Sequence, residues 1–176
     1  MRIKRLVKSV ILAIAMAAFC APASFASQKG EKVFGVRTGY ISRNRSADLG
    51  LFFQYTFSEH FRLQPSADLV FRHHNREAFT VDLNAHVPIA VTGDDFSLYP
   101  LAGINFSSWN HHFDSLEDGE LITPEWSSRT NRFGANFGAG FDLKVTSTLK
   151  ISIEACYTFI KSNSGVRVLA GIGYVF

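Results

Sequence analysis

Histidine and serine are the residue types in this chain that could bind a metal ion or take part in catalysis. The pairs His73-His74 and His111-His112 could share an ion if they lay in neighbouring loops, because imidazole is a common zinc ligand. Adjacent residues of an extended chain point to opposite sides, so each pair readily offers one ligand only. We therefore interpret both pairs as solvated loop residues, and we predict no metal site and no cofactor.

Charged side chains of both signs recur at alternate positions, opposite a row of apolar residues. Arg62 and Asp68, for example, share a face from which Leu63 points away, and His86 and Cys156 fall on the same polar face. Five positive and five negative residues on this face predict ion pairs inside a narrow lumen, where each charge must find a partner. They are Arg37, Asp48, Arg62, Asp68, Asp82, Asp142, Lys144, Lys150, Glu154 and Arg167.

These side chains must be positioned by strands, because the pattern after residue 26 has a period of two and no helical spacing over a useful length. The predicted strands are 33–41, 47–57, 61–71, 78–89, 96–109, 131–145, 149–160 and 165–176. The short connections are 58–60, 90–95 and 146–148. The connections that are on average longer and more polar are 42–46, 72–77, 110–130 and 161–164. An even number of strands with this asymmetry predicts an all-β fold, an eight-stranded antiparallel up-and-down transmembrane β-barrel with its longer loops outside the cell.

The apolar face is the one expected to meet lipid. No charge interrupts it in the middle of any segment, and a charge at the bilayer midplane costs about 2–4 kcal/mol. Phe and Tyr concentrate near segment ends, as in the aromatic girdles of membrane barrels. Glycines on the polar face leave room for long side chains, so we expect a plugged lumen without a wide pore. The alternative is a soluble periplasmic, lipocalin-like barrel with its apolar face inward.

The first 26 residues are predicted to be an export signal. Basic residues precede an apolar stretch over 9–19 and small residues over 21–26, and we place cleavage between Ala26 and Ser27. The chain carries 18 basic and 15 acidic residues. Four of the basic residues lie in the signal, which leaves 14 against 15 and argues against a nucleic-acid partner. The predicted organisation is a signal peptide over 1–26 and a barrel domain over 27–176.

The last segment carries a family resemblance. Alternate positions hold Val168, Ala170, Ile172, Tyr174 and Phe176, a pattern that resembles the C-terminal assembly signal of outer-membrane proteins. Together with the signal and the eight segments, the chain resembles the OmpA/OmpX-like eight-stranded outer-membrane β-barrel family. The resemblance implies insertion from the periplasm by the barrel-assembly machinery into the outer membrane of a Gram-negative bacterium. It also implies contact with outer-membrane lipids and lipopolysaccharide, and a structural or surface-interaction role.

Some eight-stranded barrels modify lipid A, so the chain must be compared with them. The deacylase type carries a late-strand His-x-Ser-Asn motif, in which the histidine activates the serine. Residues 160–163 resemble it, with Ser162 and Asn163 in place, but Ile160 stands where the base belongs and cannot accept a proton. Palmitoyl transfer would need His, Ser and Asp gathered at the outer rim, and no spacing demands that arrangement. We therefore predict no enzymatic activity.

The 110–130 connection is the most distinctive candidate for contact with an extracellular partner. It is acidic and rich in aromatic residues, and loops longer than about 12–15 residues are usually functional or disordered. It could bind a cationic partner, a divalent ion or a host surface, or it could be a solvated extension that shields the barrel mouth. The predicted contact residues are Trp109, Phe113, Asp114, Glu117, Asp118, Glu120 and Trp126. Three functions stay open: a structural or adhesion protein, a small porin, and a lipid A-modifying enzyme.

Overall fold

The computed structural model describes residues 29–73, 76–92, 95–113, 116–117, 120–121, 126–161 and 164–176. The predicted export signal therefore lies outside the described residues. In the described part, no helix is long and apolar enough to cross a membrane. The strands are β1 (Lys32–Ile41), β2 (Ser46–Ser58), β3 (Phe61–His73), β4 (Arg76–His86), β5 (Ile89–Thr92), β6 (Phe96–Phe113), β7 (Leu116–Glu117), β8 (Glu120–Leu121), β9 (Trp126–Thr146), β10 (Leu149–Ile160) and β11 (Gly165–Val175).

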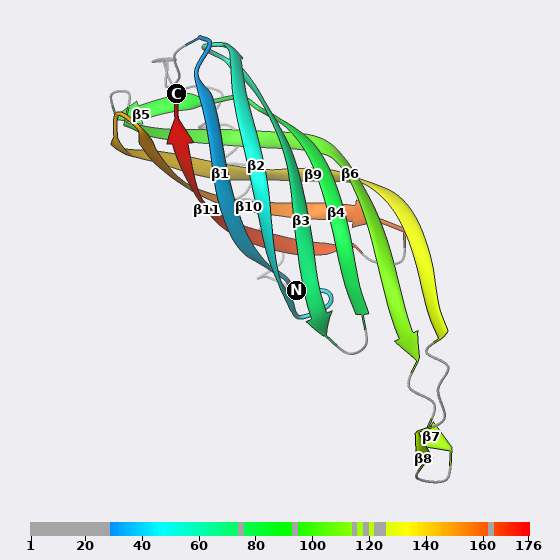
Figure 1. The fold of residues 1–176 in the computed structure, drawn as a ribbon. Helices are drawn as coiled ribbons and strands as arrows, with labels where there is room; N and C mark the ends of the chain where they lie inside the picture. Colours follow the sequence, from blue (N-terminus) through cyan, green and yellow to red (C-terminus); the bar gives the residue numbers. More distant parts are fainter. Residues whose placement is uncertain are drawn as a thin grey trace, which may run out of the picture.

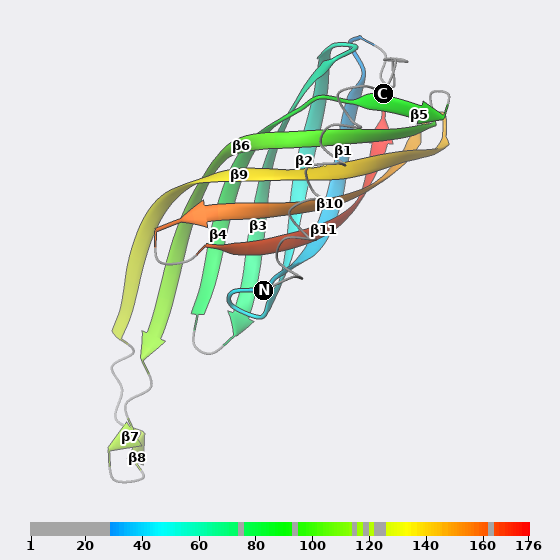
Figure 2. The same ribbon diagram turned by 180° about the vertical axis from the view of Figure 1, so that it is seen from behind.

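The long strands form a closed antiparallel barrel. The sheet order is β4-β3-β2-β1-β11-β10-β9-β6-β5, and the pairing of β4 with β6 joins the two ends. The wall contains β1, β2, β3, β4, β6, β9, β10 and β11, each paired with its neighbour on either side, and Figures 1 and 2 show them tilted around a common axis. The predicted eight-stranded up-and-down barrel is confirmed.

One predicted strand is divided in the structure. The alternation predicts a single strand over 78–89, whereas β4 ends at His86 and β5 begins at Ile89. Pro88 stands in the gap and has no N–H to donate to the ladder. The Val87 N–H still donates to Pro100 O at 3.2 Å, so β5 stays paired along β6 and occupies part of the predicted 90–95 connection.

The predicted 110–130 loop is largely a β-hairpin. Strand β6 continues to Phe113 and β9 starts at Trp126, and the two pair without a break from Phe96↔Leu143 to Phe113↔Trp126. In Figure 1 this hairpin extends well past the other strands, with the two-residue strands β7 and β8 at its tip. The sequence pattern misses this extension because both faces of a hairpin beyond the barrel rim meet water. Apolar and polar residues then no longer need to alternate.

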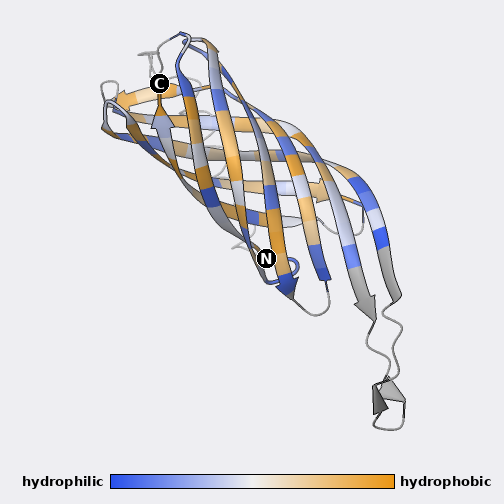
Figure 3. Cartoon of the chain, viewed as in Figure 1, coloured by the Kyte–Doolittle hydropathy of each residue, from blue (hydrophilic) through white to orange (hydrophobic). Residues whose placement is uncertain are grey.

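The two faces of the wall differ in chemistry. Large apolar side chains point outward, such as Leu51, which is 50% exposed, and Ile172, which is 45% exposed. Figure 3 shows apolar residues along the middle of the strands and hydrophilic ones towards the outer part of β9. Outward-facing aromatic residues gather near both ends of the wall. They are Phe34, Phe57, Phe61, Tyr174 and Phe176 at one end, and Tyr40, Phe71, Phe79, Tyr157, Phe159 and Phe133 towards the other. This distribution fits a wall embedded in lipid, with an aromatic girdle at each interface.

Barrels of the outer membrane have short periplasmic turns and longer external loops, so we expect the end that carries the β6–β9 hairpin to face outside the cell and name it the extracellular end. At the opposite end, two-residue turns separate β2 from β3 and β9 from β10. At the hairpin end, four residues separate β1 from β2 and another four separate β10 from β11.

A charge on the outer wall should destabilise the protein in a bilayer. We expect Leu51→Arg to lower the free energy of unfolding by about 2–4 kcal/mol, because the guanidinium would face hydrocarbon midway along the strand. Ser147→Arg, in the exposed turn after β9, is the matched control and should cost about 0–1 kcal/mol. Urea unfolding in phosphatidylcholine vesicles measures both variants. Equal midpoints would show that Leu51 does not face lipid.

Candidate functional site

The centre of the lumen holds a network of two arginines and four carboxylates. Arg37 forms a two-pronged pair with Asp68, with Nε 2.8 Å from Oδ1 and Nη2 2.6 Å from Oδ2. Its Nη2 also donates to Asp82 Oδ2 at 3.2 Å, and its Nη1 lies 3.6 Å from Glu154 Oε2. All of these side chains are buried. Because the four carboxylates outnumber the two guanidinium groups, each arginine forms ion pairs with several carboxylates.

Arg167 is the second arginine of this centre and bridges three aspartates. Its Nε donates to Asp48 Oδ2 at 2.8 Å and its Nη1 donates to Asp82 Oδ2 at 2.8 Å, while Nη2 lies 2.9 Å from Asp68 Oδ2. Asn105 donates to the other oxygen of Asp82 at 2.6 Å. Together with Arg37 and Glu154, the network therefore ties β1, β2, β3, β4, β6, β10 and β11 together across the lumen.

A second cluster surrounds Arg62, nearer the periplasmic end. Arg62 is fully buried, pairs with Asp142 and lies 3.0 Å from His86 Nδ1. Since a guanidinium can only donate, His86 Nδ1 is the acceptor and the ring is neutral with its proton on Nε2. The Tyr99 ring stacks on His86 at 4.5 Å, and its hydroxyl donates to Glu154 Oε1 at 3.0 Å. These are residue types used in catalysis, but they are enclosed on all sides and offer no surface to a substrate.

Glu31, which directly precedes β1, lies at the periplasmic mouth of the lumen. Its carboxylate pairs with the Lys150 ammonium and, at 2.6 Å, with that of Lys144. Burial by itself raises the pKa of Glu31, but the two ammonium groups outweigh it and hold the pKa below its ordinary value. Glu31 therefore stays ionised at neutral pH and stabilises the two lysines.

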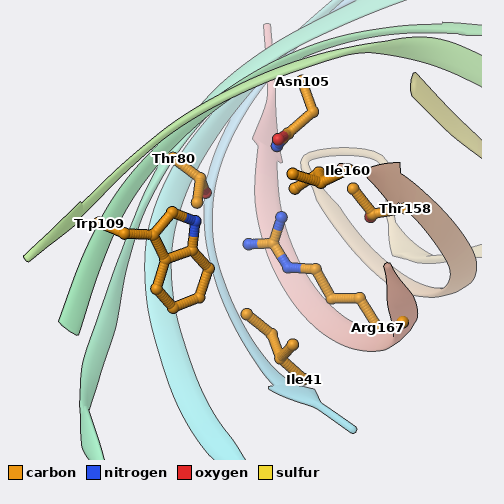
Figure 4. Close-up of a pocket in the computed structure, with 8 residues that line it drawn as sticks. Ile41, Thr80, Asn105, Trp109, Thr158, Ile160 and Arg167 are labelled. Atoms are coloured by element: carbon orange, nitrogen blue, oxygen red, sulfur yellow. The ribbon is translucent and has the colours of Figure 1, made fainter. Parts of the chain in front are cut away.

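The extracellular mouth is capped by an apolar layer. Val70, Ala78 and Trp109 pack together inside the barrel, with Ile41 against them. Beneath this layer lies a cavity of about 30 Å³ that Arg167 also lines (Figure 4). It has room for a water molecule or two and not for an organic ligand.

The structure corrects the placement of Trp109. Trp109 was predicted to lie in an external contact loop, whereas it lies on β6 with its side chain inside the barrel and 4% exposed. Asn105, Ser107 and Trp109 occupy alternate positions of β6 and all three are buried inside the barrel. Continuing this alternation along the strand would have predicted the inward orientation of Trp109. Of the other predicted contact residues, Phe113, Glu117, Glu120 and Trp126 lie on strands of the extended hairpin. Asp114 and Asp118 lie outside the described residues.

All ten residues predicted to form ion pairs in the lumen point into it or into its periplasmic mouth. The structure pairs Arg37 with Asp68, Asp82 and Glu154, pairs Arg62 with Asp142, and pairs Arg167 with Asp48, Asp68 and Asp82. Lys144 and Lys150 meet instead on Glu31, which the sequence reasoning missed. Glu31 lies two residues before the inward-facing Val33. The alternation along β1 therefore indicates that Glu31 also points inward.

Neutral polar residues of the same face also join the network, beside the predicted ion-pair residues. Gln54 donates to Gln64 at 2.6 Å, and Gln64 donates to Glu154 at 3.0 Å. Asn136 donates to Asp82 at 2.9 Å. All of these occupy alternate positions on the polar face, so the pattern that located the charges also marks them. Cys156 is buried beside Tyr99 and Leu101.

The residues considered for lipid A chemistry do not form a described site. Ser162, Asn163 and His74 lie outside the described residues, and Ile160 is buried and lines the small cavity beneath the apolar layer. In the described part of the chain, no group of three or more His, Cys, Asp or Glu side chains is arranged to hold a metal ion.

A comparison with protein families decides what kind of protein carries this filled lumen. The outer membrane protein beta-barrel domain family matches residues 11–176. The chain belongs to this family. Membership places the barrel in the outer membrane, where the apolar outer wall faces lipid. A search of curated proteins found no match.

Solved structures with the same fold are distant in sequence. The N-terminal β-barrel domain of OprF from Pseudomonas aeruginosa is 15% identical, covers 85% of this chain and 100% of its own, and has a TM-score of 0.66. Neisserial surface protein A is 12% identical, with 89% and 100% covered and a TM-score of 0.65. Ail, the attachment invasion locus protein of Yersinia pestis, is 16% identical, with 85% and 100% covered and a TM-score of 0.59. At these identities the likeness concerns the fold.

Removal of the arginine that bridges three acids should destabilise the barrel strongly. We expect Arg167→Met to lower the free energy of unfolding by about 3–5 kcal/mol, because it leaves buried carboxylates without their partner. Adding Asp48→Asn should recover part of the loss, since one unpaired charge is then removed. Arg43→Met, in the exposed β1–β2 turn, is the control. Urea unfolding in detergent measures all four proteins, and a loss below 1 kcal/mol for Arg167→Met would contradict the network.

The pairing of Glu31 should make stability depend on pH. Because its pKa is lowered in the folded protein, its contribution is present above the ordinary carboxyl pKa and is lost as pH falls through the folded value. We therefore expect Glu31→Gln to be less stable than the unchanged protein at pH 7, and the difference to shrink as the solution is acidified below the ordinary pKa. Urea midpoints of the two proteins at several pH values test this, and a constant difference would be the contrary result.

Proposed function

We propose that this protein is a structural and surface-interaction protein of the outer membrane, which makes contact outside the cell through the β6–β9 hairpin. The observation that carries the proposal is the length of this hairpin. Every residue from Ser107 to Phe113 is paired with β9, beyond the last outward-facing aromatic pair, Phe106 and Phe133. A paired extension holds its tip away from the membrane more firmly than an open loop does.

The filled lumen favours this role over that of a small porin. Arg62, Asp68 and Asp48 are fully buried, and Trp109 and Glu31 lie across the two mouths. Ions would cross only if the buried pairs separated, and separating them costs several kcal/mol. We infer negligible conductance and no enzymatic activity.

The relatives support a role at the cell surface by analogy. One is named a surface protein and another an attachment invasion locus protein, and the latter has also been solved with the heparin analogue sucrose octasulfate. The partner of the present chain would be set by its own hairpin, whose sequence between residues 114 and 125 carries five acidic residues and no basic one. A cationic protein surface or a divalent ion fits that charge.

Export and assembly belong to the same proposal. The basic and apolar start of the chain supports secretion and cleavage after Ala26. Val168, Ile172, Tyr174 and Phe176 line the outer face of the last strand, where the barrel-assembly machinery would read them. We propose no nucleic-acid partner.

Deletion of the hairpin tip tests the proposal. We expect replacement of residues 112–127 by Asn-Gly to leave the barrel folded and to abolish attachment of expressing cells to their target surface, because His111 and Ser128 are paired and a tight turn can join them. The measurements are cell adhesion and the mobility shift on heating in SDS. A control variant with the same Asn-Gly insert at another turn replaces Arg43-Asn44 between β1 and β2. Undiminished adhesion by the folded deletion variant, or steady single-channel currents from the unchanged protein, would contradict the proposal.

A further inference from the structure

One edge of the β6–β9 hairpin meets no other strand in the part of the chain that the structure describes. On the β6 side, β4 covers the hairpin as far as the pair Arg76↔His111. On the β9 side, the pairing with β10 ends at Ile160↔Gly134, so residues 126–133 of β9 continue beyond β10 (Figure 1). The backbone N–H and C=O groups on that side are therefore open to a further strand. We call residues 126–133 the free edge.

The sequence of the free edge suits strand pairing. It contains neither glycine nor proline, and Trp126, Thr130 and Phe133 are residue types that favour β-strands. The Phe133 side chain, at the barrel end of the edge, is 80% exposed. The charged residues of the edge are Arg129 and Arg132, which would repel a basic strand and attract an acidic one. An acidic strand from another molecule is therefore the expected occupant.

The foot of the hairpin, where it leaves the barrel, is basic. The Arg129 Nε donates to Asn110 Oδ1 at 3.2 Å, and the Arg132 Nη1 donates to the backbone oxygen of Lys161 at 3.1 Å. Both acceptors are neutral, so these hydrogen bonds orient the two guanidinium groups without cancelling their charge. The foot therefore offers two oriented cations beside the free edge.

The far end of the hairpin is acidic. Its sequence between residues 114 and 125 carries five acidic residues and no basic one. Glu117 on β7 is paired in register with Glu120 on β8, and like charges at opposed positions of a β pair are unfavourable. Cations from another molecule beside this end would offset that cost.

This charge distribution decides how a second copy of the chain can lie against the free edge. Two copies in one membrane run parallel, so each acidic end lies beside an acidic end and each foot beside a foot, and both contacts are repulsive. Two copies in facing membranes run antiparallel, so the acidic end of each hairpin lies beside the arginines of the other. Both contacts are then attractive within about 10 Å, the screening length at ordinary ionic strength. The free edge is therefore complementary to its own antiparallel copy, in charge and in backbone pairing.

We propose that the free edge pairs with the free edge of a second copy on a facing cell, so that the protein joins cells that carry it. This inference rests on the proposed surface contact through the β6–β9 hairpin and names the partner of that contact. A single contact of this size is weak. Many copies on two apposed surfaces bind together, however, and multivalency raises the overall affinity.

Reversal of charge at either end of the hairpin tests the pairing. Cells labelled in two colours express the unchanged protein, an end-reversed variant, Glu117→Lys with Glu120→Lys, or a foot-reversed variant, Arg129→Glu with Arg132→Glu. Each variant alone should form about fivefold fewer cell aggregates than the unchanged protein, because like charges then meet at both contacts. A one-to-one mixture of the two variants should restore aggregates that contain both colours, because opposite charges meet again at both contacts.

The matched control makes the same change of charge away from the free edge. Arg43→Glu with Arg45→Glu, in the β1–β2 turn, should leave aggregation within about twofold of the unchanged protein. Its mixture with the end-reversed variant should form fewer two-coloured aggregates than the mixture with the foot-reversed variant. The heat-dependent mobility shift confirms that each variant is folded.

Single cysteines test the antiparallel arrangement. Ser128→Cys, in a chain that also carries Cys156→Ser, is incorporated at one copy per phosphatidylcholine nanodisc and treated with a bis-maleimide crosslinker. We expect covalent dimers that join two discs, since the free edges of facing copies lie side by side. Asn44→Cys in the β1–β2 turn should give none.

Three results would count against the inference. Failure of the end-reversed and foot-reversed variants to aggregate with each other would overturn it, and so would the absence of crosslinks from the free edge. Cells that attach to another surface through the hairpin, yet do not aggregate with one another, would uphold the proposed function and refute this inference alone.

Discussion

In hydrocarbon, every backbone N–H and C=O of the wall must find its partner within the protein, because no water is available there. The pairing of β4 with β6 satisfies the last open edge, from Arg76↔His111 to His86↔Leu101. Once the sheet is closed, side chains can point only to lipid or into the lumen, and they must alternate. The apolar outer wall and the charged interior are therefore two consequences of the same closure.

Closure also dictates how the interior is filled. Eight strands enclose a space that side chains can occupy completely, and long charged side chains need neighbours that leave room for them. Gly50 illustrates this need, because a Cβ there would lie 2.5 Å from Ala67 O and would collide with Asp68, the carboxylate that Arg37 and Arg167 share. Buried pairs of this kind add little net stability compared with an apolar core, but the loss of one partner is costly. The network therefore holds the strands in one arrangement.

The sequence predicted those features of the fold that depend on the alternation of apolar and polar residues along each strand. The inward orientation of Arg37, Arg62 and Arg167 follows from the alternation, and so do most strand bounds. The closed barrel follows from the even number of segments and the alternating lengths of their connections. The alternation predicts nothing where a strand residue lacks a backbone N–H or where the strand leaves the membrane-spanning wall. Pro88 divides a strand through its missing N–H, and the β6–β9 hairpin continues beyond the segments in which apolar and polar residues alternate. The choice of partners within the lumen depends on how far each side chain reaches across it, which no local pattern encodes.

On the extracellular side, the rim of the barrel and the end of the β6–β9 hairpin carry opposite charges. Among the described side chains at the extracellular end, cations outnumber carboxylates, whereas residues 114–125 at the end of the hairpin are acidic by sequence. The cations are Arg43, Arg45, Arg72, Arg76, Arg129, Arg132 and Lys161, and the carboxylate is Glu77. An acidic segment is repelled by an anionic leaflet, and this repulsion fades within about 10 Å at ordinary ionic strength. The paired strands β6 and β9 carry that segment beyond the rim (Figure 1). A basic rim is attracted to an anionic membrane surface and an acidic segment is repelled by it, so both charges favour a hairpin that points away from the membrane.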